Sequence, residues 1–202
     1  MDVIGSWNFR GRDLLEERID AAVQAGGHDA IVHALERVLQ QAIIDPLIGL
    51  PPCVLEPIAD HYARRELLRS ARHGYSVIAM TWGPGQGTPL HDHSGLWCVE
   101  GVWQGCLEIT PYRMVEDAGE IAHLTPERVI QSERGSAGSL IPPHEYHTIR
   151  NACPEQIAVS VHVYEGVMEH STLFLPIAGR PGWYRRESLA MAIDGCSGET
   201  VS

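Results

Sequence analysis

Two histidines, His91 and His93, stand two residues apart, just after a Gly/Pro-rich turn at residues 83–87. The residues on either side of the pair are typical of β-strands, and side chains at i and i+2 of a strand project from the same face. We therefore expect the two imidazoles to converge while Asp92 points away from them. Two converging imidazoles make half of a metal site, so a further ligand must come from elsewhere in the chain.

His147 is the best candidate for the third ligand. It follows a turn with two prolines, begins a predicted strand and precedes Asn151 by four positions. Three neutral imidazoles without a carboxylate can hold Fe(II) and leave coordination positions open for substrate and O₂, including an anionic ligand such as a thiolate. The alternative is that the two histidines bind no metal and have their hydrogen bonds satisfied at the surface or in the core.

A second polar row follows the predicted strand at residues 157–164. One face of this strand carries Ser160, His162 and Tyr164, and the other carries three valines. Side chains alternate between the two faces of a strand, and a row of Ser, His and Tyr suits the lining of a small polar cavity inside a barrel. The alternative is that the three polar groups bond to nearby loops.

Composition limits the classes of protein that fit. The chain has 202 residues, with 44% hydrophobic and 20% charged residues, which suits one compact domain with a real core. A net charge of −11 argues against a nucleic-acid partner. No apolar run approaches the roughly 18–20 residues of a membrane-spanning helix, and the N-terminus does not resemble a signal peptide. We expect a cytoplasmic location and no membrane partner.

The five cysteines are scattered and form no CxxC pair. They predict neither a structural zinc site nor a disulfide framework, and most of them are expected to be buried as small hydrophobic residues. Cys106 and Cys153 have no base nearby in sequence, so a nucleophilic role is not favoured. The five positions are Cys53, Cys98, Cys106, Cys153 and Cys196.

Hydrophobic periodicity predicts helices within residues 11–44, with a break at residues 26–29 and Asp29 as the N-cap of the second helix. Residues 59–68 fit either a helix or an extended segment. The tail from residue 173 reads as a loop, an aromatic segment and a short helix near residues 188–193. Between them, short β-rich runs alternate with turns, at residues 76–82, 96–103, 106–112, 121–124, 129–132, 138–141, 147–151 and 157–164.

Many short strands at near-regular spacing are typical of a sandwich or barrel. We therefore expect a mostly β fold, a small β-barrel with N-terminal helices packed outside it. The whole chain, residues 1–202, is expected to be a single domain. Within it, residues 10–70 would form the helical cover and residues 75–185 the barrel.

Two motifs resemble those of the cupin superfamily, whose barrel is jelly-roll-like. The first motif is matched by Gly85, five residues, the His91–His93 pair, four residues, Cys98, six residues and Gly105. Cys98 stands where cupins usually have a glutamate. His147, three residues and Asn151 match the end of the second motif. His144 stands where that motif has a glycine, which is a departure in the turn.

Within that superfamily, residues 58–185 resemble the cysteine dioxygenase group of thiol dioxygenases. The resemblance implies one mononuclear Fe(II) per chain with His91, His93 and His147 as ligands. Substrate thiolate and amine would chelate the iron beside O₂, and both oxygen atoms would go to sulfur, giving a sulfinate. The segments that carry the resemblance begin at Tyr62, Trp82, His91, Cys98, His147 and Ser160.

The resemblance also implies roles for other residues. Tyr164 would sit over the iron, with Ser160 and His162 hydrogen-bonding and orienting it. Cys98 matches the cysteine that forms a thioether with this tyrosine in animal enzymes, whereas many bacterial relatives have glycine. A Cys98–Tyr164 crosslink and a plain buried thiol both stay open.

Tyr62 and Arg64 match the Tyr-x-Arg segment that binds the substrate carboxylate, since a guanidinium can grip a carboxylate through two hydrogen bonds. Arg65 is the alternative, and a solvated arginine pair is another. Relatives that prefer 3-mercaptopropionate carry glutamine here, which favours cysteine as the substrate. The surrounding pocket, with Trp97 and Tyr146, differs from the animal enzyme, so other small thiol carboxylates stay open.

The predicted function is thus a thiol dioxygenase acting on L-cysteine or a close thiol carboxylate, with 3-mercaptopropionate and mercaptosuccinate as alternatives. A protein of another class, a non-catalytic metal-binding cupin that serves as a sensor or binding module, is the competing hypothesis. A metal-dependent isomerase or a different dioxygenase is less favoured, because such cupins usually retain the glutamate that Cys98 replaces. The oligomeric state, and whether the metal is iron, zinc or nickel, stay open.

Overall fold

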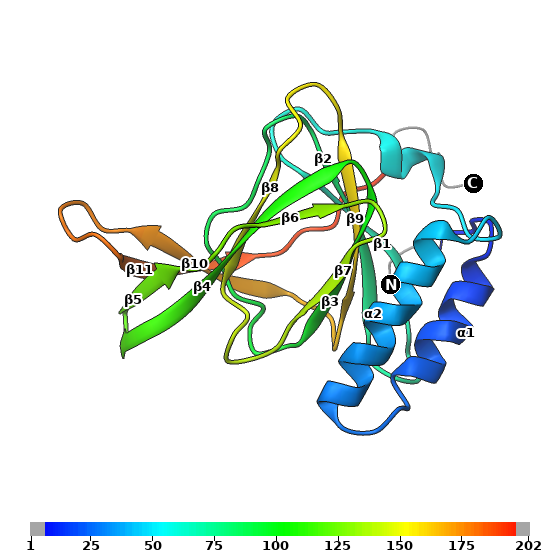
Figure 1. The fold of residues 1–202 in the computed structure, drawn as a ribbon, viewed down its shortest axis with the longest axis horizontal. Coiled ribbons are helices and arrows are strands. Elements are labelled where there is room, and N and C mark those ends of the chain that lie inside the picture. Colours follow the sequence, from blue (N-terminus) through cyan, green and yellow to red (C-terminus); the bar gives the residue numbers. More distant parts are fainter. Residues whose placement is uncertain (1–6, 197–202) are drawn as a thin grey trace.

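The computed structural model describes residues 7–196, so residues 1–6 and 197–202 of the predicted 1–202 domain lie outside the described part. Two β-sheets face each other, and a pair of helices packs on the outer side of one sheet (Figure 1). The helices are α1 (Arg12–Ala22) and α2 (His28–Ile44), followed by the 3₁₀ turn η1 (Pro52–Leu55). None of the described helices is both long and apolar enough to cross a membrane.

The first sheet has the order β1-β2-β9-β3-β7 and is buried on both faces along its central strands. Alternate side chains explain this burial. Val161 and Val163 point outward to pack with Leu35 and Leu39 of α2, while the residues between them point inward. The strands of this sheet are β1 (Ala63–Arg69), β2 (Ser76–Trp82), β3 (Cys98–Gln104), β7 (Ala137–Leu140) and β9 (Ala158–Tyr164).

The second sheet has the order β10-β11-β5-β4-β6, and β8 also pairs with β4. Its β5, β10 and β11 project away from the helices (Figure 1). Phe174 and Leu124 are buried between these strands with Leu90. The strands are β4 (Cys106–Ala118), β5 (Ile121–Pro126), β6 (Ile130–Glu133), β8 (His147–Asn151), β10 (His170–Pro176) and β11 (Trp183–Ala190).

The expected mostly β fold of the cupin type, with N-terminal helices outside, is confirmed. The barrel, however, is not closed by continuous strand pairing within residues 7–196, because the β1 and β7 edges of the first sheet pair with no strand of the second. Isolated bridges, Gly87 to Arg150 and His91 to His147 and Leu173, connect the loop before β3 to the second sheet. The interior therefore lies between two facing sheets.

Two segments differ from the sequence-based expectation, and a third decides between the alternatives left open. Residues 59–68 fitted either a helix or an extended segment, and the extended alternative is confirmed, since β1 covers residues 63–69. The helical cover predicted for residues 10–70 therefore ends before this strand. The predicted helix at residues 188–193 is wrong, since β11 runs to Ala190, and the predicted loop after residue 173 is strand β10. β1 pairs with β2 and β10 pairs with β11, each its neighbour in the chain, and β11 also pairs with the distant β5, so pairing between strands outweighs local propensity.

A break between two helices is confirmed, but it lies at residues 23–27 rather than 26–29, and the predicted cap is not confirmed. The second helix starts at His28 with Gly27 at the N-cap position, so Asp29 lies in the first turn. A carboxylate there still stabilises the helix through its dipole.

The expectation that no disulfide forms is also wrong. Cys53 of η1 and Cys196 of the C-terminal segment are disulfide-bonded across a sequence separation of 143. Only the fold brings them together, so no local spacing could reveal the pair. Cys98 is fully buried, whereas Cys106 and Cys153 are only half-buried.

Candidate metal and substrate site

His91, His93 and His147 meet inside the molecule, and one ligand nitrogen from each lies within 4.8 Å of the others. Their ring centroids are 4.4 Å apart for His91 and His147 and 5.0 Å for His93 and His147. All three side chains are buried. Among the described residues, no carboxylate or cysteine joins this cluster.

The predicted convergence of His91 and His93 is confirmed, but a strand does not produce it. Both lie in the loop between β2 and β3, where the backbone of His91 exchanges two 3.2 Å hydrogen bonds with His147. The Asp92 carboxylate points away and accepts hydrogen bonds from the backbone N–H groups of Ser94 and Thr172. The loop is thus held from both sides, which orients the two imidazoles.

Hydrogen bonds set the tautomers of two of the histidines. Nδ1 of His91 lies 3.1 Å from the carbonyl oxygen of Pro89, and Nδ1 of His147 lies 2.9 Å from that of Glu145. A carbonyl can only accept, so each Nδ1 carries the proton and each Nε2 keeps a free lone pair. Such backbone contacts are typical of metal-binding histidines.

The cluster fits a metal ion. Nε2 of His147 and Nδ1 of His93 are buried without a hydrogen-bond partner. Burial lowers the pKa of all three imidazoles below their usual value, so each is neutral and able to bind a metal at neutral pH. The cluster could therefore hold a metal ion.

The polar row of β9 faces β3 in register. Tyr164 lies opposite Cys98, and His162 lies opposite Glu100. Trp82 Nε1 donates to Ser160 Oγ at 2.9 Å, so the Ser160 hydroxyl is free to donate to His162 Nε2 at 2.7 Å. The tryptophan, serine and histidine thus form one hydrogen-bonded chain.

The expected hydrogen-bonding of Tyr164 by Ser160 and His162 is corrected. Within the described residues, His162 Nε2 bonds to Ser160, and Nδ1 faces Cys98 Sγ at 3.8 Å and Glu100 Oε2 at 3.4 Å. The His162 ring instead lies nearly parallel to that of Tyr164, with centroids 6.0 Å apart and planes inclined by 12°. The His162 nitrogens are thus directed at other groups, and its ring lies alongside the tyrosine ring.

Arg64 and Arg65 point in opposite directions. The Arg64 guanidinium donates to the carbonyl of Ala192 at 3.0 Å, while its buried Nε has no partner. Arg64 lines one groove together with Tyr164. Arg65 instead bonds to Thr81 Oγ1 and to the carbonyl of Glu56. The geometry therefore puts Arg64, and not Arg65, on the side of Tyr164.

Two adjoining cavities surround this cluster. The one at the three histidines has only about 10 Å³ of accessible volume, room for roughly one water or ion. The groove lined by Arg64 and Tyr164 has about 490 Å³. Met168 and Met191 line both, and Tyr62, stacked 4.5 Å from Trp82, walls the smaller one. Flexible methionine side chains separate the groove from the histidines.

Two parts of the site were missed by sequence reasoning. The segment around Asp194 pairs with Arg64 through hydrogen bonds of 2.7 and 2.8 Å, and no motif marks it. Glu100 is buried beside His162, and burial raises its pKa to about 8. Its position two residues after Cys98, on the same strand face, was the signal that could have revealed it.

Residues 57–174 match the family model of cysteine dioxygenase type I. The chain belongs to the cysteine dioxygenase type I family. The match covers more than half of the chain and includes Arg64, the three histidines and Tyr164. Family and histidine cluster together support a metal-dependent dioxygenase of the cupin kind.

Solved structures also resemble this cysteine dioxygenase family member. A Klebsiella pneumoniae protein with a double-stranded β-helix domain is 19% identical, with a TM-score of 0.47 over 64% of this chain and 92% of its own. A Thermus thermophilus protein is 17% identical, with a TM-score of 0.44 over 58% and 94%. Oxalate oxidase in complex with glycolate is 19% identical, with a TM-score of 0.42 over 54% and 53%.

Proposed function

We propose that the protein is a non-haem Fe(II) thiol dioxygenase that acts in the cytoplasm on L-cysteine or a close small thiol carboxylate. One thiol and one O₂ give one sulfinic acid, with both oxygen atoms on sulfur. The observation that carries the proposal is the three-histidine cluster that adjoins a groove lined by Arg64 and Tyr164.

The ligand set suits iron. His91, His93 and His147 would hold one ferrous ion per chain, and three neutral imidazoles without a carboxylate leave positions for an anionic substrate group. When bound, the ion supplies the redox chemistry that lets O₂ react with a thiolate. The protein residues bind, orient and protect the reactants.

Arg64 is the proposed binder of the substrate carboxylate. Its unpartnered Nε and its place in the groove leave donors available for an acid. A guanidinium prefers a carboxylate and grips it through two parallel hydrogen bonds. Holding the carboxylate there would direct the thiol end toward the histidines and so reduce the entropic cost of reaction.

Tyr164 is the proposed hydrogen-bond donor at the reacting oxygen atoms. Burial raises the pKa of its hydroxyl well above the usual value, so the group keeps its proton. The Trp82–Ser160–His162 chain holds the stacked His162 ring, which fixes the tyrosine ring beside His93 at 5.5 Å between centroids. The full burial of this row excludes bulk water.

The alternatives differ in what they require of these residues. In this protein Arg64 could bind the carboxylate of 3-mercaptopropionate or mercaptosuccinate as well as that of cysteine, although the arginine favours cysteine, and an assay distinguishes these substrates. A non-catalytic metal-binding cupin would need only the histidines. The placement of Arg64 and Tyr164 in one groove beside them favours an enzyme.

The test is oxygen uptake after anaerobic loading with Fe(II). Cysteine, 3-mercaptopropionate and mercaptosuccinate carry a carboxylate, and cysteamine is the matched thiol without one. We expect thiol-dependent uptake with at least one thiol carboxylate and stoichiometric sulfinate, with cysteamine much slower. Protein loaded with zinc or nickel is the metal control. No uptake with any of the thiols would contradict the proposal.

A further inference from the structure

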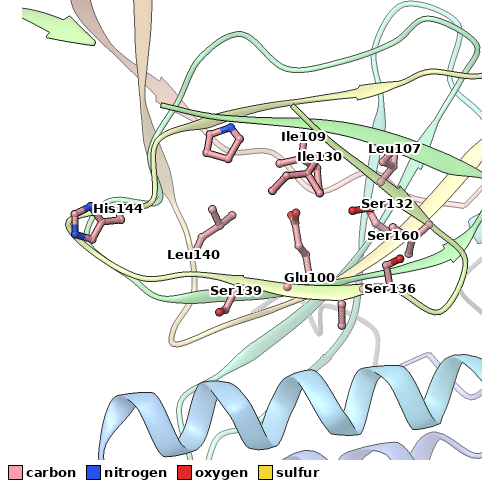
Figure 2. Close-up of a pocket in the computed structure, with 15 residues that line it drawn as sticks. Glu100, Leu107, Ile109, Ile130, Ser132, Ser136, Ser139, Leu140, His144 and Ser160 are labelled. Carbon is pink, nitrogen blue, oxygen red and sulfur yellow. The ribbon is translucent and has the colours of Figure 1, made fainter. Parts of the chain in front are cut away.

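A second interior cavity of about 320 Å³ lies between the two sheets. Strands β3 and β7 form one wall, and β4 and β6 form the opposite one (Figure 2). It has no lining residue in common with the histidine pocket. The two spaces are nevertheless neighbours, because Ser160 lines this cavity and bonds to His162, which lines the pocket.

Glu100 is the acidic residue of this cavity, whose lining also includes four serines and His144. Its carboxyl group points into the space, and only 8% of the residue is exposed (Figure 2). Oε2 has no hydrogen-bond partner, since His162 Nδ1 at 3.4 Å lies outside hydrogen-bond geometry. A buried carboxyl oxygen without a partner is costly, so a donor that reaches it would stabilise the complex.

The space above Glu100 exists because the residue opposite it is a glycine. Gly138 pairs with Glu100 across β3 and β7, and a Cβ atom added there would meet no atom within 4 Å. Leu107, Ile109 and Leu140 line the surrounding apolar wall. The cavity thus combines an apolar wall, several serine hydroxyl groups and one acidic group, and a largely apolar lining with a few polar groups is usual for a small-molecule site.

We propose that this cavity binds a small organic amine, whose ammonium group pairs with Glu100 and whose apolar body fills the space beside Gly138. A hydrocarbon would leave Oε2 unpaired, and an anion would bury a charge that no arginine or lysine among the lining residues balances. An uncharged amine that meets a protonated Glu100 takes its proton and gives the same neutral ion pair, so no net charge is buried. The proposal does not depend on the function proposed for the histidine site.

Binding of benzylamine to the full-length protein, measured by calorimetry and ligand-observed NMR, tests the proposal. Benzyl alcohol and benzoate have the same apolar body with a neutral and an anionic head group. We expect saturable binding of benzylamine and at least about tenfold weaker binding of both controls, as the loss of a charge-assisted hydrogen bond implies.

Two variants locate the site. Glu100→Gln should weaken benzylamine binding by about tenfold or more and remove the preference over benzyl alcohol. Gly138→Val occupies the space beside Glu100 while keeping the glutamate and should abolish binding, so it decides the matter even if Glu100→Gln does not fold. His93→Ala is the control for binding at the histidine pocket and should leave the affinity unchanged. Equal binding of all three compounds, or binding lost in His93→Ala but kept in Gly138→Val, would overturn the proposal.

Discussion

Cys98 and Tyr164 lie directly opposite each other on the antiparallel strands β3 and β9, and both side chains are buried. Residues paired in this way project from the same face, with Cβ atoms about 4.5–5.5 Å apart. Burial raises the pKa of both groups well above their usual values, so the sulfur is a thiol and the phenol keeps its proton. The pairing brings the two groups that a thioether would join next to each other.

We expect a Cys98–Tyr164 thioether to form during aerobic turnover of the iron-loaded protein. The new C–S bond replaces one S–H and one ring C–H bond, and O₂ accepts the electrons and protons. Peptide mass spectrometry should show the two peptides joined and two hydrogen atoms lighter than their sum. Cys98→Ser should abolish this species and Cys106→Ser should keep it, whereas separate peptides of unmodified mass would rule the crosslink out.

His147→Ala should lose most of the bound iron. The His147 Nε2 lone pair is the unpartnered ligand atom that this change removes, so we expect the iron content to fall from one ion per chain to a small fraction. His144→Ala is the matched control, because His144 is exposed and lies outside the cluster. Metal analysis after gel filtration measures both, and full iron content in His147→Ala would refute the ligand assignment.

We expect Arg64→Gln to weaken substrate binding and Arg65→Gln to lower the stability of the fold. We expect Arg64→Gln to raise the KM for a thiol carboxylate by about tenfold or more, since a charged bidentate contact is lost, with little effect on cysteamine. Arg65→Gln should leave KM unchanged and lower the thermal midpoint, because it removes bonds to Thr81 and Glu56. A similar rise of KM in both variants would argue against Arg64 as the specific binder.

Glu100 should make the stability of the protein decrease as the pH rises. Its folded pKa of about 8 lies above the unfolded value of 4.5, so the unfolded chain loses its proton first. The stability it contributes is fully present below pH 4.5 and is lost as the pH rises through 8. The free energy of unfolding of Glu100→Gln, relative to that of the wild type, should therefore rise between these two pH values by on the order of 3 kcal/mol. Urea unfolding at pH 5 and pH 8.5 measures the gain, and an equal difference at both values would contradict it.

The sequence predicted the parts of the fold that carry local periodic patterns. The two helices and the inward polar row of residues 158–164 follow from spacing alone, because each pattern repeats within a single element. It left β1 open between a helix and an extended segment, and it did not predict β10 and β11. Each of these strands depends on pairing with another strand, which for β11 includes β5, about sixty residues away in sequence, and the residues of a single segment do not reveal that pairing.

For the site, residue types and spacing by themselves determined the three histidines and their shared metal chemistry. Only the tertiary structure decided that Arg64 rather than Arg65 faces Tyr164, that Cys53 meets Cys196, and that Glu100 lies unpaired beside His162. The physical reason is the same in each case. Imidazole chemistry belongs to the residue, whereas direction, partnership and desolvation depend on how distant strands pack against each other.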